Sequence, residues 1–122
     1  MSRLSTLITL DTQEAVKRLL TQIPKLRQMA EDGDIDAMLL LIEFDELWRD
    51  SRLTTREAQV VEMRYIDGYM EKAVAAELGI SQTRISLVAK NGITRIIGEC
   101  QRRLAKGDAT FAAYGNYGKD VD

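Results

Sequence analysis

Several side chains between positions 81 and 95 are of the types that recognise nucleic acids. Glutamine can form two hydrogen bonds with adenine, arginine can pair with guanine or hold a phosphate, and methyl groups of threonine or leucine can contact the thymine methyl. Lysine and arginine also contact the phosphate backbone, which positions a protein without specifying sequence. We therefore expect these side chains to contact DNA: Ser81, Gln82, Thr83, Arg84, Ser86, Leu87, Lys90 and Arg95.

The charge of the chain is distributed unevenly. Its formal net charge of -2 argues against a simple polycation that coats nucleic acid. Residues 1–50 carry six basic and ten acidic side chains, whereas residues 51–106 carry ten basic and six acidic ones. The second segment is therefore the part of the chain that we expect to face phosphates.

The chain lacks the residue patterns that enzymes and metal sites use. It has no histidine and a single cysteine, Cys100, and no glycine-rich phosphate-binding loop is present. Asp32, Asp34 and Asp36 mark a helix start rather than a calcium loop, because the later glycine and glutamate ligands are missing. We therefore expect no catalytic residues, no cofactor and no metal.

No membrane or export signal is recognisable in the chain. The longest apolar run, residues 37–42, is much shorter than the roughly 20 residues that span a bilayer. The N-terminus lacks the apolar stretch and cleavage site of a signal peptide. We expect a cytoplasmic protein of a bacterial host cell, associated with the nucleoid and not with a membrane.

Three helices are predicted in the first 50 residues. The first runs from about position 12 to 22, Pro24 begins a second short helix that ends near Gly33, and Asp34 caps a third that ends near Asp50. The third helix has a wide apolar face, which we expect either to pack on the rest of the chain or to form a dimer or partner surface. Its members are Ile35, Met38, Leu39, Leu41, Ile42, Phe44, Leu47 and Trp48.

Three further helices are predicted in residues 51–106. Thr54 and Glu57 have the spacing of a capping box, which begins a helix that runs to about Tyr65. A second helix covers about residues 70–78. The last begins after its cap, Ser81, and runs to about position 104.

The segment from Glu71 to Lys90 fits a helix-turn-helix. Two helices that cross around a tight turn need a small residue at their closest approach, which Ala75 provides, and a residue that tolerates a positive φ, which Gly79 provides. The apolar positions fall on the inner faces of both helices: Val74, Leu78, Ile80, Ile85 and Val88.

The fold class that these patterns predict is all-α. An acidic helical segment, residues 1–50, is expected to serve dimerisation or partner docking. A helix-turn-helix DNA-binding domain with a long last helix follows in residues 51–106. Residues 107–122 are rich in glycine without periodicity, so we expect a flexible tail.

Residues 53–65, LTTREAQVVEMRY, resemble the opening of region four of bacterial sigma factors. That family shows Leu-Thr-x-Arg-Glu-Ala-x-Val followed by Met-Arg and an aromatic residue, and the similarity continues through the helix-turn-helix and the helix after it. The resemblance implies a four-helix domain that recognises the promoter -35 element and contacts RNA polymerase. It implies that Arg64 lies near the DNA backbone, and that four residues contact bases: Gln82, Thr83, Ser86 and Leu87.

The sequence thus predicts a sequence-specific transcription regulator that binds promoter DNA, similar in layout to small sigma-like regulators of phages and prophages. One helix-turn-helix makes few base contacts, so we expect a partner: a second copy through residues 35–48, or RNA polymerase. Two alternatives remain open. The protein could bind RNA polymerase or a sigma factor and redirect transcription without recognising DNA, or serve as the DNA-recognition subunit of a phage packaging machine.

Overall fold

The computed structural model describes residues 12–105, which fold into helices without a strand among them. Two helices come first, α2 (Gln13–Glu31) and α3 (Ile35–Asp50), and pack against each other. Both helices begin at a side-chain cap: the Thr12 side chain accepts from the amide of Ala15, and that of Asp34, the cap predicted from the sequence, accepts from the amide of Ala37. The all-α prediction is confirmed for this part of the chain; the predicted tail, residues 107–122, lies outside it.

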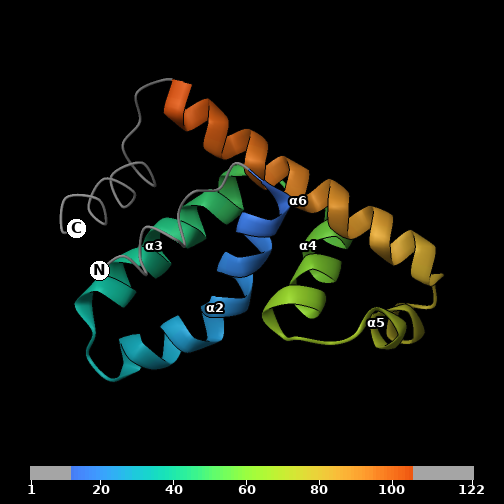
Figure 1. The fold of residues 1–122 in the computed structure, drawn as a ribbon, viewed down its shortest axis with the longest axis horizontal. Coiled ribbons are helices and arrows are strands. Elements are labelled where there is room, and N and C mark those ends of the chain that lie inside the picture. The colour runs from blue at the N-terminus through green and yellow to red at the C-terminus, as the bar shows by residue number, and fades with distance from the viewer. Residues whose placement is uncertain (1–11, 106–122) are drawn as a thin grey trace.

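Pro24 does not begin a new helix, contrary to the sequence prediction. It lies inside the continuous helix α2, whose axis bends along its course in Figure 1. A proline inside a helix removes one hydrogen bond and clashes with the preceding turn, at a cost of about 3 kcal/mol. Pro24 itself is exposed, while Ile23 and Leu26 beside it are buried and continue the apolar face of Leu19 and Leu20. Burial of each such side chain contributes roughly 1.5–3 kcal/mol, which offsets the cost.

The apolar face of α3 is divided by the fold. Phe44 and Leu47 are buried, and Leu41 and Trp48 pack partly against the same core. The other predicted members of the face remain exposed: Ile35, Met38, Leu39 and Ile42. Only half of the predicted face is therefore covered by the described residues.

The next helix is interrupted near its end. It begins as α4 (Thr55–Val61) with the predicted capping box, in which Glu57 N–H donates to Thr54 Oγ1 at 3.1 Å and Thr54 N–H donates to Glu57 Oε1 at 2.9 Å. It then continues as a π-helical turn, η1 (Glu62–Ile66), which the sequence did not predict. Such turns add one residue to the helical repeat and rotate the side chains that follow.

The last two helices are α5 (Glu71–Leu78) and α6 (Gln82–Ala105). Figure 1 shows α6 along one side of the molecule, with α4 and α5 next to its N-terminal half and α2 and α3 nearer its C-terminal half. None of the described helices is long and apolar enough to cross a membrane.

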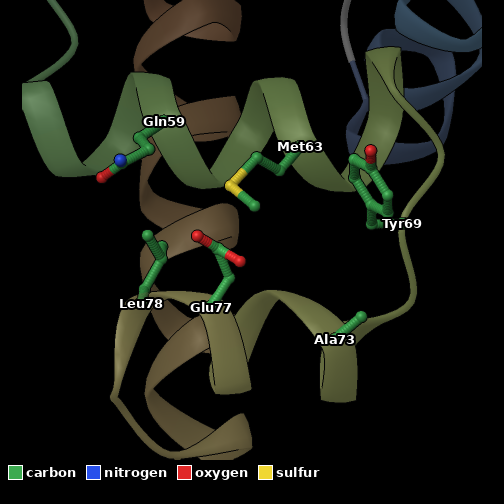
Figure 2. A pocket seen from close by; sticks show the side chains of 6 residues that line it. All are labelled: Gln59, Met63, Tyr69, Ala73, Glu77 and Leu78. Atoms are coloured by element: carbon green, nitrogen blue, oxygen red, sulfur yellow. The ribbon is translucent and has the colours of Figure 1, made fainter.

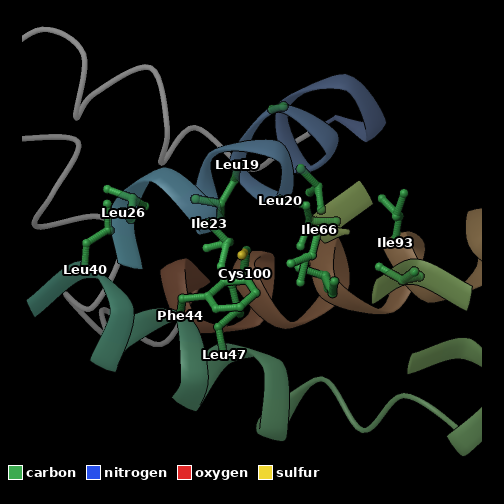
Figure 3. Packing of buried hydrophobic residues seen from close by; sticks show 14 of the residues in the cluster. Leu19, Leu20, Ile23, Leu26, Leu40, Phe44, Leu47, Ile66, Ile93 and Cys100 are labelled. Atoms are coloured by element: carbon green, nitrogen blue, oxygen red, sulfur yellow. The ribbon is translucent and has the colours of Figure 1, made fainter. Parts of the chain in front are cut away.

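Helices α2, α3 and α6 share one hydrophobic core with the end of α4 and with η1. Figure 3 shows how the side chains of these elements converge. The cluster is filled by large aliphatic residues with Phe44 and Cys100, and its fully buried members include Leu19, Leu20, Ile23, Leu40, Leu47, Val61 and Ile93. The N-terminal helices are therefore packed directly on the elements that precede and follow the helix-turn-helix.

A buried arginine links the far end of α6 to α3. Arg103 is 8% exposed, and its guanidinium group lies 2.7 Å from Asp50 Oδ2 and 3.0 Å from Glu99 Oε2. Glu99 is also buried and pairs with Arg102. Loss of these partners would leave a buried arginine unpaired, which would strongly destabilise the fold. The ion pair therefore holds the C-terminal end of α3 against α6.

Helix α6 packs closely against α4 at Gly92. A Cβ atom at this position would lie 2.8 Å from Val61 Cγ2 and 3.4 Å from Glu57 Cβ. Val61 is completely buried and has a stiff, branched side chain, so it has little room to move. A glycine inside a helix normally costs about 1 kcal/mol relative to alanine, and this close approach explains why the chain has one here.

We expect Gly92→Ala to be at least about 1 kcal/mol less stable than Gly98→Ala. Both substitutions gain helix propensity, but only the first overpacks a core, which typically costs about 1–3 kcal/mol. A Cβ at Gly98 would meet nothing within 4 Å, so this variant is the matched control and should match or exceed the wild type. Urea unfolding measures both, and equal stabilities of the two variants would contradict the packing argument.

We also expect Cys100 to make stability depend on pH in alkaline solution. Burial raises the pKa of its thiol from 9.0 to about 11, with smaller opposing effects of Arg103 and Glu99. The unfolded chain therefore loses a proton that the folded chain retains, so the contribution of Cys100 is complete below pH 9 and is lost as the pH rises towards 11. Unfolding of wild type and Cys100→Ala across this window isolates the effect, on the order of 2 kcal/mol. A difference between the two proteins that stays constant with pH would refute it.

Candidate nucleic-acid interface

The turn between α5 and α6 has the geometry of a helix-turn-helix. Gly79 ends α5 in the left-handed conformation, with φ 69°, and its amide and that of Ile80 both donate to the carbonyl of Ala75, at 2.9 and 3.1 Å. Ser81 Oγ then accepts from the amide of Arg84 at 3.1 Å and caps α6. The predicted roles of Gly79 and Ser81 are thereby confirmed.

A second, smaller hydrophobic cluster holds the two helices of the motif together. Its buried members are Val60, Val74, Ala75, Ile85, Val88 and Ala89, and the half-buried Leu78 and Ile80 pack against them. These include all five apolar positions that the sequence placed on the inner faces. Because Val60 comes from α4, the cluster also fixes the motif on the preceding helix.

The opposite side of the first turns of α6 is exposed. All the predicted contact residues from the cap to the third turn lie there: Ser81, Gln82, Thr83, Arg84, Ser86, Leu87 and Lys90. Leu87 is 50% exposed, so its side chain is accessible on this face. From Ser81 to Lys90 the helix rises about 14 Å, so this face is long enough to enter a major groove about 12 Å wide.

Arg95 is engaged inside the molecule. Its Nε lies 2.8 Å from Oε1 of Glu57, the same oxygen that closes the capping box of α4. About half of the Arg95 side chain remains exposed, and it lies about 21 Å along the axis from Ser81. It is therefore separate from the first turns of α6, on a part of the helix that is fixed to α4.

Arg64 lies on η1, whereas the other predicted contact residues belong to α6 or its cap. Its Nη1 donates to the carbonyl of Tyr69 at 2.9 Å, and its guanidinium carbon lies 5.0 Å from the centre of the Tyr65 ring. Its Nε is buried without a hydrogen-bond partner among the described residues. Arg64 thus ties the link before α5 to the end of the preceding helix.

One contact next to this face was not predicted from the sequence. The side chain of Gln13, at the start of α2, donates to Thr94 Oγ1 at 3.0 Å and to the carbonyl of Lys90 at 3.4 Å. A polar residue at the start of a helix gives no signal for a partner 77 residues later. The first turn of α2 is therefore packed beside α6 just beyond the exposed turns.

Residues 51–96 match the family model of sigma-70, region 4. This segment is therefore a helix-turn-helix domain like sigma-70 region 4, and we call it the region 4 domain. The match covers α4, η1, α5 and α6 as far as Ile96, and it contains every predicted contact residue. The region 4 domain is a DNA-binding helix-turn-helix and not a catalytic domain. No curated protein and no solved structure matches the chain.

The region 4 domain also has a groove of about 360 Å³ between α4 with η1 on one side and α5 on the other (Figure 2). It is lined by Gln59, Met63, Tyr69, Ala73, Glu77 and Leu78. Its one charged lining residue, Glu77, would repel a phosphate. Among the described residues there is also no group of three His, Cys, Asp or Glu side chains that could hold a metal. The exposed turns of α6 are therefore the surface that best fits nucleic acid.

Proposed function

We propose that the protein is a sequence-specific transcription regulator of bacterial or phage origin, which recognises promoter DNA with the first turns of α6. The observation that carries this proposal is the region 4 domain with its recognition face uncovered. The side chains of that face from Gln82 to Lys90 take part in no hydrogen bond or ion pair with the described residues. They are therefore available to bases and phosphates.

The residue types suggest a division of roles on this face. Gln82 suits a bidentate contact with adenine, and Arg84 suits guanine or a phosphate. Leu87 and Thr83 offer apolar groups for thymine methyls. Lys90 adds charge for the backbone, as do two arginines that the fold holds elsewhere, Arg64 and Arg95, which position rather than specify.

The charge of the chain indicates that one domain is not sufficient for tight binding. Acidic side chains predominate in residues 1–50, which reduces non-specific attraction to DNA. A single helix-turn-helix also contacts few base pairs. We therefore infer that a partner adds affinity, with RNA polymerase and a second copy as the two candidates from the sequence.

A second function, binding RNA polymerase or a sigma factor without recognition of DNA, is favoured by one observation. Four exposed apolar residues of α3 lie outside the region 4 domain and are suited to a protein partner. This alternative predicts that substitutions of Gln82 or Arg84 leave activity unchanged.

Selection of bound duplexes from a random DNA library with the purified full chain should enrich one sequence motif. Anisotropy titration of the selected duplex at two salt concentrations then gives the affinity and its salt dependence. A symmetric motif would indicate two copies, and an asymmetric one a single copy or a polymerase-assisted complex. Failure to enrich any motif would refute DNA recognition and favour the second function, which a pull-down with RNA polymerase tests next.

On the selected duplex, Arg84→Ala and Lys90→Ala should behave differently. If Arg84 contacts a base, its loss should cost about 1–3 kcal/mol and relax the preference at one base pair. Loss of Lys90 should weaken all sequences equally and reduce the salt dependence. The same sequence-independent effect from both variants would contradict base recognition by Arg84.

Leu87 gives a further test on the same duplex. Replacing each thymine of the site by deoxyuridine removes one methyl group, and a buried methyl contributes about 0.8 kcal/mol, or roughly a four-fold change in affinity. We expect at least one such replacement to weaken binding of the wild type by this amount and to have no effect on Leu87→Ala. Equal sensitivity of both proteins to deoxyuridine would show that Leu87 does not contact the methyl group.

A further inference from the structure

An apolar stripe runs along the exposed side of α3. We define the α3 stripe as Ile35, Met38, Leu39 and Ile42, which are between 39% and 67% exposed. Their spacing of three and four residues places them on one side of the helix, opposite its buried face. They are four of the seven large hydrophobic side chains that are exposed among residues 12–105. The stripe is therefore a patch and not a scatter of single side chains.

This spacing is the one that helices use to bind other helices. An amphipathic helix binds a partner through side chains at i, i+3, i+4 and i+7, and the α3 stripe has this pattern. An exposed apolar patch of this kind normally marks a protein interface. Because the other face of α3 packs into the core, the stripe is held on a fixed support.

The charges of α3 determine which partner fits. From Ile35 to Asp50 the helix has one basic residue, Arg49, whose Nε lies 3.6 Å from Asp50 Oδ1. Its acidic residues are Asp36, Glu43, Asp45, Glu46 and Asp50. Asp50 is paired with Arg103 and Arg49. Two copies that paired along the stripe would bring Asp36, Asp45 and Glu46 of one copy near those of the other, and like charges beside an interface oppose association. A helix with basic flanks would be attracted instead.

We propose that the α3 stripe binds an amphipathic helix of another protein, whose apolar side covers the stripe and whose flanks carry lysine or arginine. In Figure 1, α3 and the first turns of α6 lie at opposite ends of the molecule, so a helix on α3 leaves the DNA-recognition face open. The protein can then hold this partner and DNA together. The proposal does not depend on which DNA sequence is recognised.

The test uses two fluorescent synthetic peptides of about 18 residues, or five helical turns, with leucine at i, i+3, i+4 and i+7. The other positions are lysine in one peptide and glutamate in the other. By anisotropy, the lysine peptide should bind the full chain at least about ten-fold more tightly than the glutamate peptide. This preference should shrink at high salt.

Variants locate the binding surface. Leu39→Gln combined with Ile42→Gln keeps every charge and should weaken binding of the lysine peptide by at least about ten-fold, whereas Met70→Gln, an exposed apolar residue outside the stripe, should leave it unchanged. Asp45→Asn with Glu46→Gln should weaken it by roughly two- to five-fold at low salt. The DNA affinity of the two variants that keep every charge, Leu39→Gln with Ile42→Gln and Met70→Gln, should stay at the wild-type value.

Three outcomes would overturn the proposal. The lysine peptide could fail to bind, or the double glutamine variant could bind it as tightly as the wild type. The chain could also sediment as a dimer that this variant converts to a monomer, which would assign the stripe to a second copy.

Discussion

Both hydrophobic clusters depend on the close packing of α6 against α4 at Gly92. Val60 and Val61 are consecutive, and both are completely buried, yet they belong to different clusters. Val61 joins the core of the N-terminal helices, while Val60 joins the core of the helix-turn-helix. Helix α4 therefore lies between the two cores, and α6 closes both of them. A side chain at Gly92 would move α6 away from α4, so the loss of contact would affect both clusters together.

The π-helical turn η1 follows α4 at the point where the chain passes between the two hydrophobic clusters. It directs Ile66 into the larger cluster and places Tyr65 against both clusters. After it, the chain turns at Gly68, whose φ of 82° suits glycine, and the amide of Tyr69 donates to Met63 O at 2.9 Å. Met70 then begins α5 without a side-chain cap. The π turn, the turn at Gly68 and the start of α5 at Met70 together orient α5, and α5 in turn positions the first turns of α6.

The features that could be predicted from the sequence are those that depend on residues close to one another in the chain. Three side-chain caps each act over three residues, so their residue types were sufficient to place them: Asp34, Thr54 and Ser81. The exposed turns of α6 were predicted for the same reason, since the motif fixes which positions face inward. Pro24 was misjudged because the burial of Ile23 and Leu26 in a core assembled from distant segments outweighs a local preference. The π turn and the Arg95–Glu57 pair likewise depend on packing that no local pattern encodes.

The recognition helix is not a separate element, because α6 continues without a break from Gln82 to Ala105. Its length is about 36 Å, and its far end is anchored to α3 through Arg103 and Asp50. Because the helix is continuous, a tilt of about 10° around its middle would displace its N-terminal end by roughly 3 Å, a distance that breaks a hydrogen bond. In the proposed complex, the angle at which α6 enters the groove would be set partly by contacts some 30 Å from the bases. Altered packing of α2 and α3 would then change DNA recognition without any change in the proposed contact residues.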